Sequence, residues 1–204
     1  MFSPKGMELE RGWPGRIDGD RVVQLAAQTL QAFFTGGGGA REHAEYALAD
    51  VELRAPVRHP PGIRLFGDGG DFAFGNTAAV YGPEDDVPYP EGSGDLRAQP
   101  AVAAVVGADG AVGGFTAANA WQAPDLPGAK RFDFALSIGP WVLTPDDFDA
   151  PSWDERVALA ARNTHLRPGE LLVAPSGPAL PVELGPVAVS VEGIGVLRNR
   201  VVAR

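Results

Sequence analysis

The sequence contains no cysteine, no long apolar run and no excess of basic side chains. Without cysteine, the chain has no disulfide bond, thiolate zinc site, cysteine nucleophile or iron–sulfur cluster. No apolar stretch approaches the roughly 20 residues that span a bilayer, so we expect no membrane partner. Acidic side chains (26) outnumber basic ones (17), and the net charge of −9 disfavours nucleic-acid binding. The first residues also lack the apolar core of a signal peptide, and we expect a cytoplasmic protein.

Histidine is scarce as well, with three in the chain. His43 has Glu42 and Glu45 close by, a combination that can bind a metal or transfer protons. On a helix, however, adjacent residues point in different directions, so a solvated helix face is the favoured interpretation. His59 and His165 lie in turn-rich segments and have no evident partner. The sequence also lacks the G-x-S-x-G motif of serine hydrolases and the phosphate-binding loop motif.

Glycine and proline, in contrast, are abundant, at 27 and 19 of 204 residues. Both interrupt helix interiors, so they argue against a helical bundle and favour many short strands joined by turns. We therefore predict a mainly β protein with a mixed α+β character. Proline and glycine become dense after residue 55. This change predicts a small N-terminal α+β unit (1–55) followed by a main domain (56–204).

The pattern of the N-terminal unit predicts a hairpin and two helices. Short β-prone runs flank the turn at residues 18–20. Apolar residues at helical spacing predict a helix over residues 26–34, which the glycines at 36–39 would end. A second short helix is predicted over residues 40–50.

In the main domain the pattern predicts strands and one helix. Two apolar segments flank a turn at residues 108–110, which indicates a hairpin. Residues 132–143 are typical of a strand, and residues 153–161 of a helix. Residues 187–191 and 195–202 are expected to pair as a closing hairpin.

Four groups of segments together resemble the fumarylacetoacetate hydrolase family, in family order. They are NTAAVYGPEDDVP (76–88); VAAVVG (102–107) with GFTAANAWQAPDL (114–126); SIGPWVLTPD (137–146); and LRPGE (166–170) with VEGIGVLRNRVV (191–202). The resemblance spans roughly residues 50–204, and residues 10–35 are similar to the family's N-terminal unit. It implies a mixed β-sandwich or roll core. It also implies cleavage, decarboxylation or isomerisation of oxo acids with magnesium or manganese held by carboxylates.

The positions equivalent to the family's metal ligands do not keep that chemistry. Counting back from Gly107, the two glutamates of the family strand fall on Gln99 and Ala101, and the family's ligand aspartate falls on Ala120. The preceding asparagine is retained as Asn119. Replacing three anions by neutral side chains removes most of the Coulomb attraction for a dication, so we expect no metal cofactor.

Other functional positions are also changed. The family's active-site lysine falls on Phe132 by one subgroup's spacing and on Lys130 by another's, and the choice stays open. Ser176 lies near a family threonine and keeps a hydroxyl group. The family's lid, which carries a glutamate–histidine pair, should lie within residues 61–74, where no histidine occurs. A family hairpin within residues 149–163 is expected to be missing.

These changes predict a homodimeric family member that has lost metal-dependent hydrolysis. It would bind an oxo-acid-like small molecule or act as an accessory protein. The alternative is an enzyme with altered, metal-independent chemistry, in which Lys130, Ser176 and Asn119 supply the polar groups, with Lys130 as a cation or an amine nucleophile. A third interpretation is a hydrolase whose ligands come from elsewhere, such as Asp125 and Asp133. Fold alone does not decide among these functions.

Overall fold

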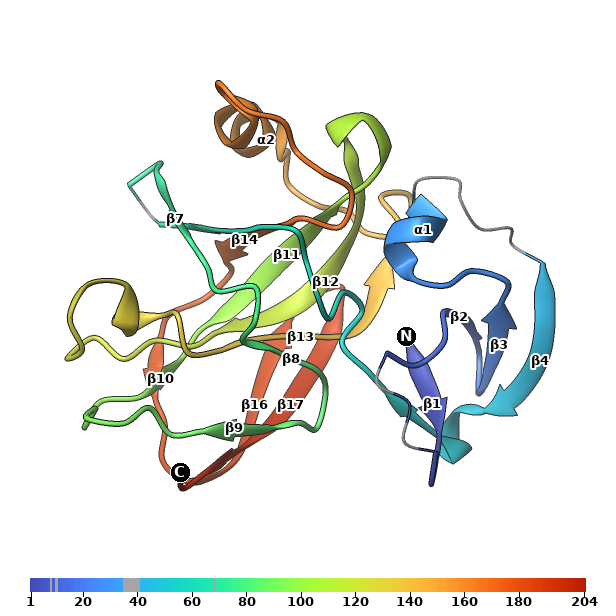
Figure 1. Ribbon diagram of the computed structural model, residues 1–204, viewed down its shortest axis with the longest axis horizontal. Helices are drawn as coiled ribbons and strands as arrows, with labels where there is room; N and C mark the ends of the chain where they lie inside the picture. The colour runs from blue at the N-terminus through green and yellow to red at the C-terminus, as the bar shows by residue number, and fades with distance from the viewer. Residues whose placement is uncertain (8, 10, 35–40, 68) are drawn as a thin grey trace.

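The computed structural model describes the chain except for residues 8, 10, 35–40 and 68. Strands dominate it, which confirms the mainly β prediction (Figure 1). Within the described residues, no helix has the length and apolar character needed to cross a bilayer.

The centre of the main domain is a seven-stranded sheet in the order β7-β6-β14-β11-β12-β13-β8. Its strands are β6 (Ile63–Phe66), β7 (Phe72–Phe74), β8 (Val80–Tyr81), β11 (Pro100–Val106), β12 (Val112–Ala120), β13 (Leu136–Leu143) and β14 (Leu171–Pro175). β11 pairs antiparallel with both β12 and β14. Its sequence is almost continuously apolar because both of its faces are buried. The turn between β11 and β12 is a 3₁₀ helix, Ala108–Gly110, so the predicted hairpin is confirmed.

A second sheet, in the order β16-β17-β9, packs against one face of the central sheet (Figure 1). Its strands are β9 (Asp86–Pro88), β16 (Gly185–Val191) and β17 (Gly195–Val202), and β16–β17 is the predicted closing hairpin. Ala104 and Ala117 of the central sheet share one buried cluster with Val189 and Leu197. A two-stranded pair, β10 (Arg97–Ala98) and β15 (Leu180–Pro181), lies beside the two sheets. The helix α2 (Asp154–Ala161) confirms the one predicted over residues 153–161.

The N-terminal elements gather on one side of the molecule (Figure 1). They are β1 (Phe2–Pro4) paired with β5 (Val51–Leu53), and a sheet of β2 (Gly15–Asp18), β3 (Arg21–Leu25) and β4 (Glu42–Ala47). Phe2, Val22 and Val51 form a separate small core. The division at residue 55 stays a prediction.

The helix predicted over residues 40–50 is wrong. Residue 40 lies outside the described residues, and the rest of this segment contains β4 and then a 3₁₀ helix, Leu48–Asp50. Its two glutamates form ion pairs with neighbouring strands, since Glu42 pairs with Arg16 and Glu45 with Arg21. Tertiary pairing therefore overrides a pattern that is locally compatible with a helix.

Two other predicted elements are shorter than expected. The helix over 26–34 is reduced to α1 (Leu30–Phe34), where the Thr29 hydroxyl accepts a hydrogen bond from the Ala32 N–H (3.0 Å) in the manner of an N-cap. The glycines predicted to end it, 36–39, lie outside the described residues. The strand predicted over 132–143 begins only at Leu136. A 3₁₀ helix, Gly128–Arg131, precedes it, and its last turn uses the backbone N–H groups of Phe132 and Asp133.

Candidate functional site

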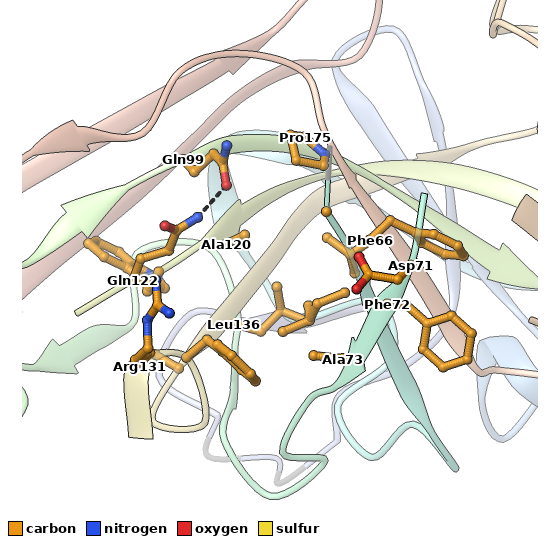
Figure 2. A pocket seen from close by; sticks show the side chains of 16 residues that line it. Phe66, Asp71, Phe72, Ala73, Gln99, Ala120, Gln122, Arg131, Leu136 and Pro175 are labelled. Carbon is orange, nitrogen blue, oxygen red and sulfur yellow. Dashed lines mark hydrogen bonds between the residues drawn. The ribbon is translucent and has the colours of Figure 1, made fainter. Parts of the chain in front are cut away.

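A pocket of about 410 Å³ opens at one end of the central sheet (Figure 2). One wall comes from the β6–β7 hairpin, and the facing wall comes from Gln99, the end of β12 and the 3₁₀ segment before β13. Ala120, Leu136 and Val173 form an apolar floor between the walls. The pocket is thus built from segments that lie far apart in the sequence and meet through sheet pairing.

The facing wall is polar because two amide side chains meet there. The Gln122 Nε2 donates a hydrogen bond to the Gln99 Oε1 (Figure 2). The Gln99 Nε2 in turn donates to the Gly177 carbonyl (3.2 Å). The Gln99 amide is therefore engaged on both sides. Arg131 extends along the same wall and lines the pocket below Gln122 (Figure 2).

The hairpin wall carries Phe66, Asp71, Phe72 and Ala73. Its turn is glycine-rich, and Gly70 adopts a left-handed φ of 75° that a residue with a Cβ rarely takes. A buried ion pair between Arg64 of β6 and Glu170 ties the hairpin to the start of β14.

Arg64 also stacks under the aromatic side chains of this hairpin. Its guanidinium lies 5.6 Å from the ring centre of Phe72 and 5.7 Å from that of Phe74. These contacts hold the hairpin wall in place beside the pocket.

The structure brings several of the sequence-predicted residues together. Gln99, Ala120 and Phe132 all line the pocket. The Ala120 N–H donates to the Gln99 carbonyl (2.9 Å), so the two residues lie side by side. Ala101 is fully buried in the cluster that also contains Leu136 and Val173.

Asn119 is buried behind this wall, where its Oδ1 accepts a hydrogen bond from the Gln99 backbone N–H (2.9 Å). It therefore positions the backbone that carries Gln99 and does not line the pocket.

Lys130 and Ser176 lie outside the pocket. The Lys130 side chain is 71% exposed, and its Nζ pairs with the Asp133 carboxylate (2.8 Å). Ser176 is exposed, and its backbone N–H donates to the Pro100 carbonyl (2.9 Å).

Arg131, Gln122 and Asp71 line the pocket although sequence reasoning did not single them out. Lys130 and Arg131 are adjacent in a 3₁₀ helix, where successive side chains are about 120° apart, so only one of them can face the pocket. When the segment is assigned as a strand, the sequence does not reveal that Arg131 and not Lys130 faces the pocket. The one available signal for Gln122 was its place two residues after Ala120, on the same side of an extended chain.

The donor set does not fit magnesium or manganese. At the three positions that the sequence resemblance equates with ligands (Gln99, Ala101 and Ala120), the chain offers one neutral amide, already hydrogen-bonded, and two methyl groups. Throughout the described parts of the chain, no three His, Cys, Asp or Glu side chains lie close enough to hold a metal ion.

The two aspartates considered as substitute ligands are engaged elsewhere. Asp125 accepts hydrogen bonds from the Gly94 N–H (2.6 Å) and the Ser93 hydroxyl (2.7 Å), which hold the pKa of its carboxyl below the ordinary value. Asp133 pairs with Lys130.

No protein-family model matches the sequence, and no curated protein sequence matches it either. Solved structures do match over nearly the whole chain. Maleylpyruvate hydrolase from Sphingobium sp. SYK-6, in complex with manganese(II) and pyruvate, is 19% identical with a TM-score of 0.79, covering 95% of this chain and 97% of that chain.

Two further structures are similar. A 2-keto-3-deoxy-D-arabinonate dehydratase complexed with magnesium and 2,5-dioxopentanoate is 14% identical, with a TM-score of 0.79 and coverage of 100% and 98% of the two chains. A 5-carboxymethyl-2-hydroxymuconate delta-isomerase from Mycobacterium smegmatis is 20% identical, with a TM-score of 0.73 and coverage of 94% of each chain. These likenesses confirm, for the fold, the resemblance found in the sequence.

Proposed function

We propose, from the fumarylacetoacetate-hydrolase-like fold and the side chains of the pocket, that this protein binds a small oxo-acid-like molecule without a divalent cation. It would act as a binding or accessory protein and no longer perform metal-dependent carbon–carbon hydrolysis. Proteins of this fold include metal-dependent hydrolases, isomerases and dehydratases acting on oxo acids. Two of the similar structures are complexes, one with manganese(II) and pyruvate and one with magnesium and 2,5-dioxopentanoate.

The observation that carries this proposal is that uncharged side chains occupy the three positions that the resemblance equates with the metal ligands. Gln99 and Ala120 are side by side on the pocket wall, and the side-chain amide of Gln99 is hydrogen-bonded to Gln122 and Gly177. A hard dication needs several oxygen ligands, most of them anionic. Losing three carboxylates from one point removes the attraction that offsets dehydration of the ion.

The pocket nevertheless retains groups that can hold a polar molecule. The Arg131 guanidinium and the Gln122 amide offer N–H donors to a carboxylate or a carbonyl oxygen. Leu136, Val173 and Phe132 offer apolar contact to the rest of the ligand. A few directional polar groups in a mostly apolar concavity are typical of a small-molecule site.

A binding role is preferred to altered catalysis because of where the polar candidates lie. Lys130 is exposed and ion-paired, Ser176 is exposed, and the amide oxygen of Asn119 bonds to the backbone. None of these three lines the pocket. An amine nucleophile would have to be near the ligand and unpaired to react.

Calorimetric titration with pyruvate and with 2-oxoglutarate, in the presence of a chelator, tests the proposal. We expect saturable binding of at least one, unchanged when manganese replaces the chelator. Ala120→Phe should fill the pocket and weaken that binding at least about tenfold. Ala111→Phe, at an exposed position, is the matched control. Binding that requires manganese, or that Ala120→Phe leaves intact, would overturn the proposal.

A further inference from the structure

Two side chains of opposite charge line the pocket from its two walls. Arg131 belongs to the wall that carries Gln122, and Asp71 extends from the β6–β7 hairpin on the opposite side (Figure 2). Among the described residues that line the pocket, these are the only two with a charged side chain. Among these described residues the pocket therefore has one positive wall and one negative wall.

Neither charge is neutralised by the protein itself. Throughout the described part of the chain, neither Arg131 nor Asp71 forms an ion pair or a side-chain hydrogen bond, and the two do not pair with each other. The neighbouring Lys130, by contrast, is paired with Asp133. The pocket thus separates a free cation from a free anion by the space that a ligand would fill.

Asp71 is held in this place by the backbone of its hairpin. Phe66 pairs with Phe72, and the Gly67 N–H donates to the Asp71 carbonyl (3.2 Å). The buried Arg64–Glu170 pair anchors the same hairpin from below. The backbone position of Asp71 therefore follows from the sheet register.

A simple oxo acid matches only one side of this arrangement. Its carboxylate gains from Arg131, but its negative charge is repelled by Asp71, which has no partner of its own. A ligand that also carries a positive group can pair with the charged side chains of both walls. Charge complementarity at both ends gives selectivity against molecules that carry one charge only.

We infer that the ligand is a zwitterion, a molecule with a carboxylate and an ammonium group at its two ends. The carboxylate lies on Arg131 and Gln122, the ammonium lies on Asp71, and the carbon chain passes between Phe132 and Phe72. This inference rests on the proposed function and specifies its ligand further: the acid carries an ammonium group at the end remote from its carboxylate.

The test compares ω-amino acids, from glycine to 7-aminoheptanoate, with the carboxylates and the amines of matched length, by calorimetry at low salt and with a chelator. The best amino acid should bind about fivefold more tightly than its matched carboxylate and its matched amine. Asp71→Asn should reduce its affinity to that of the carboxylate, and Arg131→Gln should reduce it to that of the amine. Asp20→Asn and Arg162→Gln, which change exposed side chains away from the pocket, should leave the affinity unchanged.

The outcomes separate this inference from the proposal on which it rests. If carboxylates or pyruvate bind as tightly as every amino acid, or if Asp71→Asn has no effect, the zwitterion is wrong while the binding pocket stands. If no amino acid, carboxylate, amine or oxo acid binds, both fall.

Discussion

Gln99, Ala101 and Ala120 are the residues that the family resemblance equates with metal ligands, and the proposed absence of a metal site depends on them. Gln99 and Ala120 are joined by a backbone hydrogen bond of 2.9 Å, and Ala101 lies two residues beyond Gln99 on the same face. The triple variant Gln99→Glu/Ala101→Glu/Ala120→Asp should therefore gather three carboxylates. Their repulsion raises at least one carboxyl pKa and lowers the melting temperature near neutral pH.

Manganese or magnesium should restore the melting temperature of this variant and leave that of the parent unchanged, as thermal unfolding would show. A ligand specific for the native state stabilises it by about 2.7 kcal/mol at a hundredfold excess over its dissociation constant. If neither cation changes the melting temperature of the variant, the assignment of these three positions is wrong.

Asp125 gives a prediction about acid stability. Hydrogen bonds from Gly94 and Ser93 lower its pKa from the ordinary 3.8. Because the folded pKa is lower than the unfolded one, this carboxylate stabilises the fold above pH 3.8, and the contribution is lost as the pH falls through the folded value. Asp125→Asn should show a shallower loss of melting temperature below that pH than the parent. Asp146→Asn, at an exposed position, should follow the parent. A parallel acid profile for Asp125→Asn would contradict this account.

At the residue scale, Gln99 and Ala120 of the sequence-predicted residues line the pocket, whereas Lys130 does not. Gln99 and Ala120 could be placed by counting along strands, where side-chain direction alternates strictly. Lys130 and Arg131 lie in a 3₁₀ segment, where a single step of register changes which side chain reaches the pocket. The location of Asp71 beside the pocket depends on the pairing of β6 with β7, and the turn between these strands has no strong sequence signature.

The β6–β7 hairpin depends on the ion pair beneath it. Arg64 and Glu170 are each 5% exposed, and the Arg64 Nε is buried without a hydrogen-bond partner. Glu170→Gln leaves a buried guanidinium uncompensated, which should lower the free energy of unfolding by about 3–5 kcal/mol in urea titration. The double variant Arg64→Met/Glu170→Leu should recover much of this loss.

A surface pair provides the control for this prediction. Arg16 and Glu42 have side chains that are each 52% exposed, so Glu42→Gln should cost no more than about 1 kcal/mol. Equal losses for Glu170→Gln and Glu42→Gln would show that the buried pair does not anchor the hairpin.

At the element scale, the hairpins were predictable because their turns and apolar runs are local signals. The β11–β12 and β16–β17 hairpins follow directly from such runs. The strand β4 was not predictable, because its charged residues are explained by arginines on β2 and β3 that are about 25 residues away in the sequence. The helix predicted over residues 26–34 was overestimated because residues 26–29 form an irregular connection between β3 and α1.

For the whole molecule, we expect a homodimer. The resemblance to the family implies pairing through the main domain, and large apolar side chains such as Phe74, Leu180 and Leu184 are 69%, 57% and 59% exposed. Light scattering should give about twice the chain mass of 21.3 kDa. A mass of one chain at micromolar concentration would remove this prediction.

The central claim is that the pocket works without a divalent cation, and electron paramagnetic resonance of manganese tests it most directly. Free Mn²⁺ in water gives a sharp six-line spectrum, which broadens when a protein binds the ion. We predict that an equimolar amount of this protein, alone or with saturating small ligand, leaves the free-ion spectrum undiminished, because the former ligand positions offer one hydrogen-bonded amide and two methyl groups. A stoichiometric loss of that signal, abolished by Gln99→Ala, would contradict the account.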